Sequence, residues 1–234
     1  MLLLDANTVV DTLQNVANTA GSGELKLSFW DLFLKGGWIM WVLLVLSIVG
    51  VYIFIDKMVA IKQASKDQKF LMNKIKNYIL DGNVKSALDE CRVSSGPLAR
   101  MIEKGIMRIG RPLNDVNAAV ENVGKQEIAR LEKGLPILAS VAGGAPMLGF
   151  FGTVTGMVRA FYDMANAGNN LDIQLLSSGI YEALVTTVGG LVVGIFAYFT
   201  YNIIVARINT LVAQLEAKTT EFMDILNEPI KSIK

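Results

Sequence analysis

The sequence predicts an all-α integral membrane protein whose three transmembrane helices extend into a cytoplasmic helical bundle. The 234 residues are 52% hydrophobic with a mean hydropathy of +0.43, which is more apolar than an average soluble domain. Three stretches carry no charge for 20 residues or more, enough for a helix to cross the ~30 Å hydrocarbon core of a bilayer. Between the first two stretches, short Gly- and Pro-containing breaks divide a polar segment in the manner of successive helices.

These stretches divide the chain into eight segments. Residues 28–35, SFWDLFLK, crowd aromatic side chains against two charges, which is typical of the membrane interface and equally of the first turns of the next helix. The predicted order is a periplasmic leader (1–27), this interfacial amphipathic segment (28–35), a first transmembrane helix (36–55), a cytoplasmic helical insertion (56–134), a second transmembrane helix (135–161), a short periplasmic loop (162–178), a third transmembrane helix (179–206) and a cytoplasmic C-terminal helix (207–234).

The distribution of basic residues predicts the orientation. Near the ends of the spans, nine Lys and Arg residues fall in the insertion and the tail, against three on the other side. Because the more basic side of a membrane protein stays in the cytoplasm, we expect a periplasmic N-terminus and a cytoplasmic C-terminus.

Helix signals organise the insertion and the tail. Asn83 is a candidate N-cap, and Pro97 and Pro112 are placed to begin helices. No strong breaker follows, so the helix from Leu113 is expected to continue into the second span. The tail is expected to continue the third span as a helix ended by Pro229. One face of that helix is apolar: Ile208, Leu211, Val212, Leu215, Phe222 and Leu226.

The second and third spans each carry a stripe of small residues. Steps of three and four residues place these side chains on one face of a helix. Another helix can approach such a stripe closely and gain van der Waals contact, so we expect both stripes to be packing and assembly surfaces. They are Ala142, Ala145, Gly149, Gly152 and Gly156 in the second span, and Gly179, Ala183, Thr187, Gly190, Gly194 and Ala197 in the third.

Polar residues within the spans are candidates for a proton or ion path. Thr153 and Thr187 lie at nearly the same depth when counted from the outer ends of their spans. A lone threonine in a span usually donates to a carbonyl of its own helix, but two at one depth favour a shared polar site. Pro146 leaves a carbonyl of its helix without a donor, so a local kink is predicted there.

Glu182 is the one carboxylate inside a predicted span, which makes it a functional candidate. It either lines the polar path or forms an ion pair with Arg159, at a comparable depth across the hairpin. On an ideal helix Glu182 shares a face with Thr186, whereas Thr187 points roughly 100° further round. Both placements of Glu182 therefore stay open.

Composition excludes several chemistries. The chain has no histidine and a single cysteine, Cys91, so it lacks the residues for a metal-ligand cluster and for nucleophilic catalysis of the Ser-His or Cys-His type. We expect no enzyme activity, no cofactor and no nucleic-acid partner.

Two motifs resemble those of the MotA/TolQ/ExbB proton-channel family. GFFGTVTGM at 149–157, preceded by Pro146, is similar to the family's GLLGTVxGI motif. GIYEALVTTVGGLVVGI at 179–195 is similar to GIAEALxxTxxGL. The order of three spans around a large insertion also matches, so the resemblance covers about residues 28–226 and is strongest to the ExbB members.

The resemblance implies a function. Thr153 and Thr187 match pore-lining threonines of the family, and Glu182 matches its glutamate in the third span. It implies a pentamer in the bacterial inner membrane around an ExbD-like single-span protein whose aspartate titrates. Such a complex would turn proton motive force into work on a TonB-like protein for outer-membrane uptake. The alternatives are a TolQ-like subunit serving envelope integrity, a ring scaffold that does not conduct, and a self-contained transporter.

Overall fold

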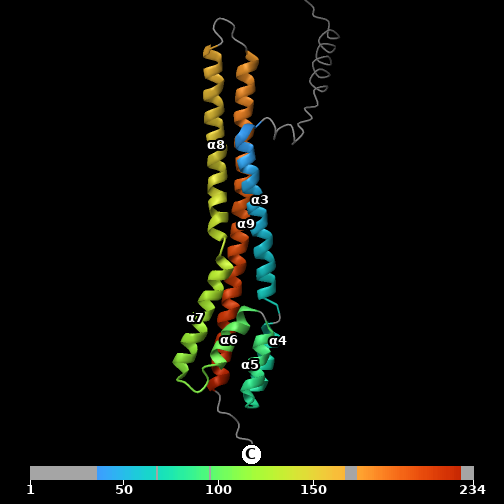
Figure 1. Ribbon diagram of the computed structural model, residues 1–234, viewed down its shortest axis with the longest axis vertical. Helices are drawn as coiled ribbons and strands as arrows, with labels where there is room; N and C mark the ends of the chain where they lie inside the picture. The colour runs from blue at the N-terminus through green and yellow to red at the C-terminus, as the bar shows by residue number, and fades with distance from the viewer. Residues whose placement is uncertain (1–35, 67, 95, 167–172, 228–234) are drawn as a thin grey trace, which may run out of the picture.

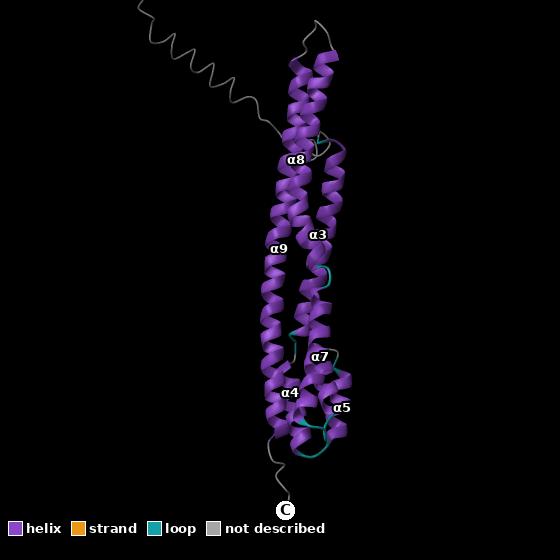
Figure 2. Cartoon of the chain, turned by 90° about the vertical axis from the view of Figure 1, so that its left-hand side faces the viewer, coloured by secondary structure: helices purple, strands orange, loops and turns teal. Residues whose placement is uncertain are grey.

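Three long helices form a rod, and four shorter helices gather at one end of it (Figure 1). The computed structural model describes residues 36–66, 68–94, 96–166 and 173–227. Within these ranges every regular element is a helix (Figure 2), so the predicted all-α fold class is confirmed. The helices are α3 (Gly37–Ala64), α4 (Gln68–Leu80), α5 (Val84–Val93), α6 (Pro97–Ile106), α7 (Leu113–Glu132), α8 (Leu135–Asn166) and α9 (Ile173–Asn227).

Three of the described helices are long and apolar enough to cross a membrane. They contain the three predicted spans but continue well beyond them. α3 extends to Ala64, α8 extends to Asn166, and α9 begins at Ile173, so the described residues at both ends of the predicted 162–178 loop are helical. The leader, the interfacial segment, residues 167–172 and Pro229 lie outside the described residues.

A turn at Gly134 separates α7 from α8. Gly134 has φ +96°, a left-handed conformation that glycine adopts without a steric penalty. The preceding residue, Lys133, still donates its N–H to the Ala129 carbonyl at 3.1 Å and caps α7, whose last residue is Glu132. The expectation that the helix from Leu113 runs straight into the second span is therefore wrong. In the sequence, the glycine immediately before Leu135 was the signal for this break between the helices.

The short helices begin where the sequence predicts. The Asn83 side chain accepts a hydrogen bond from the Ser86 N–H at 3.2 Å, which caps α5. Pro97 is the first residue of α6, where its missing N–H removes no helical hydrogen bond. Pro112 takes the position just before α7. These residues therefore set where α5, α6 and α7 begin.

That end of the molecule has its own apolar core around α9. Ile208, Leu211, Leu215 and Phe222 are all buried, which confirms the apolar face predicted for the tail. Phe222 lies against Gly105 of α6, where an added Cβ would sit 2.6 Å from the ring. Burying each large side chain stabilises the fold by about 1.5–3 kcal/mol. α9 is therefore fixed at both ends, by the membrane hairpin and by this core.

Candidate functional site

The site lies in the hairpin of α8 and α9, where the two backbones touch. An added Cβ on Gly190 would sit 2.6 Å from the Ala145 carbonyl oxygen and 2.8 Å from the Gly149 Cα. On Gly149 it would sit 2.9 Å from the Thr186 carbonyl oxygen. All of these neighbours are backbone atoms, so the contact tolerates only glycine at these two positions.

The same close approach follows the whole length of both stripes. Gly156 faces Ala183, and Gly179 faces Ala160. Nearer the other end, Gly194 faces the Pro146 ring and the Ala142 carbonyl. The stripes pack against each other within one chain, and their expected use in assembly between copies stays a prediction. The periodicity identified the packing faces, but a helix face does not say whether its partner belongs to the same chain.

Thr153 and Thr187 meet at the centre of this hairpin. Their hydroxyl oxygens are within hydrogen-bonding distance of each other, and either can be the donor. The Thr187 hydroxyl also reaches the Gly149 carbonyl at 3.2 Å, and the Thr153 hydroxyl reaches the carbonyls of Gly149 at 3.3 Å and Ala183 at 3.4 Å. Both threonines are half-buried. When Thr153 donates to Thr187, Thr187 in turn can donate to Gly149, so the hydroxyls form a short relay.

The neighbouring threonines behave differently. Thr186 is 2% exposed and donates to the Ala183 carbonyl of its own helix at 2.7 Å. Thr155 donates to the Phe151 carbonyl of its own helix at 2.9 Å. Thr155 follows the ordinary helix-internal pattern of a threonine in a span, whereas the Thr186 hydroxyl also reaches the Gly149 carbonyl of α8 at 3.5 Å. Thr153 and Thr187 are distinguished by a contact between two hydroxyl groups that belong to different helices.

The Glu182 side chain, which belongs to α9, lies beside the first residue of α3. An added Cβ on Gly37 would sit 2.3 Å from the Glu182 carboxylate, so this glycine makes room for the carboxylate beside the helix N-terminus. Negative charge is favourable there because the first N–H groups of a helix point outward. Sequence reasoning missed this contact, although the adjacent glycines Gly36 and Gly37 were a signal that something approaches closely.

The proposed ion pair between Glu182 and Arg159 is absent among the described residues. Arg159 lies 4.0 Å from Asp163, one turn further along α8, and its side chain is 79% exposed. Ala160, the next residue, continues the stripe that faces α9, so Arg159 points away from the hairpin contact. No group of three or more potential metal ligands occurs in the part of the chain that the structure describes.

Comparison of the sequence with known proteins identifies a family. A sequence profile of the MotA/TolQ/ExbB proton channel family matches residues 93–217, which include both Thr153 and Thr187. The chain belongs to this family. It is thus a proton-channel-family subunit and, with three helices long and apolar enough to span, a multi-pass membrane protein.

Relatives of this MotA/TolQ/ExbB family member carry two kinds of name. An ExbB homolog of Methanothermobacter thermautotrophicus is 28% identical over 80% of this chain and 66% of that protein. The biopolymer transport protein ExbB of Neisseria meningitidis serogroup A is 28% identical over 83% of this chain and 93% of that protein. The Tol-Pal system protein TolQ of Haemophilus influenzae is 37% identical over 44% of each chain. The chain thus spans about two thirds of the first relative's length.

Proposed function

We propose that the chain is an ExbB-like subunit of a proton channel in the bacterial inner membrane. With an ExbD-like partner, it converts proton motive force into work on a TonB-like protein for outer-membrane uptake. The observation that carries the proposal is the hydroxyl contact between Thr153 and Thr187. It supplies a hydrogen-bonded polar site inside a hairpin whose two backbones touch at Gly149 and Gly190.

The threonine pair needs a titrating group from another protein to conduct protons. Threonine hydroxyls can orient and relay water but do not hold a proton near neutral pH. Glu182, the one carboxylate of the spans, lies beside the first turn of α3. We infer that an aspartate on a single-span protein supplies the titrating group at the depth of the threonines.

The exposed faces of the hairpin fit a ring around such a partner. Phe150 and Val158 of α8, with Leu184 and Val188 of α9, leave apolar surface uncovered by this chain. In the proposed assembly, five copies use such surfaces to contact each other, the lipid and the partner. The N-terminus is periplasmic and the C-terminus cytoplasmic in this proposal, following the excess of basic residues beside one end of the spans.

Proton flux into liposomes tests the proposal. The purified chain, alone or with the single-span protein that copurifies with it, is reconstituted with a pH-sensitive dye inside. Flux is expected from the complex and not from the chain alone. Thr153→Val and Thr187→Val each remove a hydroxyl while keeping the shape, and each is expected to lower flux about tenfold, the effect of one hydrogen bond of ~1.4 kcal/mol.

Thr155→Val is the matched control. It removes a hydroxyl of the same helix that bonds only to carbonyls of that helix, so its flux should equal the unmodified protein's. Equal flux from all three variants would assign Thr153 and Thr187 to helix packing. Absence of flux from the unmodified complex would support a scaffold that does not conduct, and flux from the chain alone would make Glu182 the first suspect for its own titrating group.

A TolQ-like role in envelope integrity is the second candidate. The 37% identity to a TolQ protein favours it. Deleting the gene separates the two roles: loss of energised outer-membrane uptake supports the ExbB-like role, and detergent sensitivity with normal uptake supports the TolQ-like role.

A further inference from the structure

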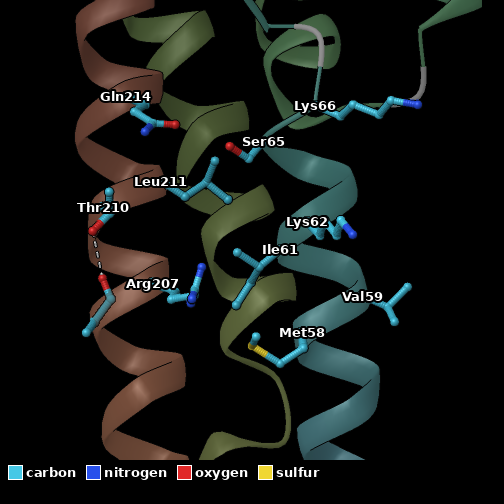
Figure 3. A pocket seen from close by; sticks show the side chains of 11 residues that line it. Met58, Val59, Ile61, Lys62, Ser65, Lys66, Arg207, Thr210, Leu211 and Gln214 are labelled. Atoms are coloured by element: carbon cyan, nitrogen blue, oxygen red, sulfur yellow. Dashed lines mark hydrogen bonds between the residues drawn. The ribbon is translucent and has the colours of Figure 1, made fainter.

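A cavity opens between α3 and α9 just beyond the apolar spans (Figure 3). Its volume is about 830 Å³, within the range of small-molecule sites. Met58 and Ile61 of α3 point toward α9, while Arg207 and Leu211 of α9 point toward α3. The cavity is partly open, and apolar and polar side chains of the two helices line it, with the Arg207 guanidinium group among them.

The charges lining this cavity are all positive. Lys62, Lys66 and Arg207 contribute to it, and no aspartate or glutamate does. Figure 3 shows Lys66 on the rim, extending away from α9. Among the described residues, none of these three cations has an ion-pair partner within 4.0 Å. Unneutralised cations around one apolar cavity favour an anionic occupant.

The depth of the cavity indicates where the anion comes from. Arg207 follows directly after the last uncharged residue of the third span, and Lys62 lies seven residues beyond Ile55, the last uncharged residue of the first. At ~1.5 Å per residue, both are within about 10 Å of the hydrocarbon edge, beside the phospholipid headgroups.

The apolar wall continues toward the membrane. Ile203 lies one turn before Arg207 on the same face of α9, and Ile55 lies one turn before Met58 and Val59 on α3. Both isoleucines are exposed. An acyl chain can follow this wall from a phosphate held at the cavity, whereas free phosphate gains nothing from it.

We propose that this cavity binds an anionic phospholipid, with its phosphate beside Arg207 and Lys62 and its acyl chains along the adjoining faces of α3 and α9. The site is separate from the threonine pair and does not depend on proton conduction. Basic cavities between transmembrane helices suit anionic headgroups because several cations are concentrated beside the headgroup phosphate.

Native mass spectrometry of the delipidated, detergent-solubilised complex tests the proposal. Phosphatidylglycerol and phosphatidylcholine are titrated separately, and the unmodified protein should prefer phosphatidylglycerol. Lys62→Gln combined with Arg207→Gln should weaken phosphatidylglycerol binding about 30-fold, ~2 kcal/mol at about 1 kcal/mol per cation. Both side chains are exposed, so the fold is preserved, as circular dichroism would verify.

The matched control is Lys85→Gln combined with Arg111→Gln. It removes the same charges from exposed positions in α5 and before α7, and it should leave lipid affinity unchanged. Thr210→Trp fills the cavity without changing charge and should also weaken binding.

Three outcomes would overturn the proposal. Unchanged phosphatidylglycerol affinity in the Lys62→Gln, Arg207→Gln variant would show that the lipid does not bind in this cavity. Displacement of the lipid by millimolar inorganic phosphate would make it a free-anion site. Loss of oligomer mass in the double variant with full lipid retention would assign the cavity to contact between copies of this chain.

Discussion

Gly190→Ala tests how closely α8 and α9 approach. The added methyl group would lie 2.6 Å from the Ala145 carbonyl oxygen and 2.8 Å from the Gly149 Cα. Ordinary van der Waals contact begins near 3.4 Å, so the helices must separate locally by ~0.8 Å. A gap of that size forfeits a quarter to a half of the attraction of each atom pair, and overpacking of this kind costs about 1–3 kcal/mol.

Gly143→Ala on α8 is the matched control. Nothing lies within 4 Å of the Cβ that it adds, so only the higher helix propensity of alanine remains, a gain of at most ~1 kcal/mol. The free energy of unfolding of both variants is measured by titrating SDS into detergent micelles and following helicity. Gly190→Ala should destabilise the protein by 1 kcal/mol or more, and Gly143→Ala should not.

Two results would refute this reasoning. Equal stability of Gly190→Ala and the unmodified protein would mean that the backbones do not touch at this position. A loss in Gly143→Ala as large as in Gly190→Ala would mean that the open face of α8 is packed just as closely, by another copy of the chain.

Two further predictions concern the insertion. Burial, followed by the charges of Glu103 and Glu90, raises the pKa of the Cys91 thiol from 9.0 to about 12. Between these pH values the folded protein holds a proton that the unfolded chain has released. The free energy of unfolding should therefore fall as the pH rises from about 9 to 12. Cys91→Ala should flatten that part of the stability profile, and an equally steep fall in the variant would exclude the thiol as its cause. For topology, Lys85→Cys and Asn169→Cys in a Cys91→Ala background are treated in intact cells with a membrane-impermeant thiol reagent. Asn169→Cys should be labelled and Lys85→Cys should not; the reverse pattern would invert the proposed orientation.

Much of the fold follows from local signals in the sequence. Uncharged stretches revealed the spans, and Asn83 and Pro97 marked helix starts because capping depends on neighbouring residues alone. The contact of Thr153 with Thr187 could be anticipated because depth in a membrane follows from residue counting.

What the sequence left open depends on contacts between distant segments. Glu182 was the expected partner of Arg159, but Asp163 of the same helix lies beside Arg159 instead. Pairing at this spacing needs no particular hairpin geometry. The place of Glu182 beside Gly37 requires α3 and α9 to be oriented with respect to each other, which neither helix's periodicity determines. The cavity at Arg207 likewise lies between two helices, and its lining residues are far apart in sequence.

The uninterrupted helix α9 connects the threonine pair to the distal core. One helix carries Thr187 in the hairpin and Phe222 in the distal core, separated by about 50 Å at 1.5 Å per residue. A 5° tilt pivoting at Thr187 would displace Phe222 by roughly 5 Å, about the pitch of one helical turn. Gly105 leaves no room for Phe222 to slide alone, so such a tilt would carry α6 with it. In the proposed channel, a small rearrangement of α9 beside the threonine pair would thus become a displacement of several ångström at the distal bundle.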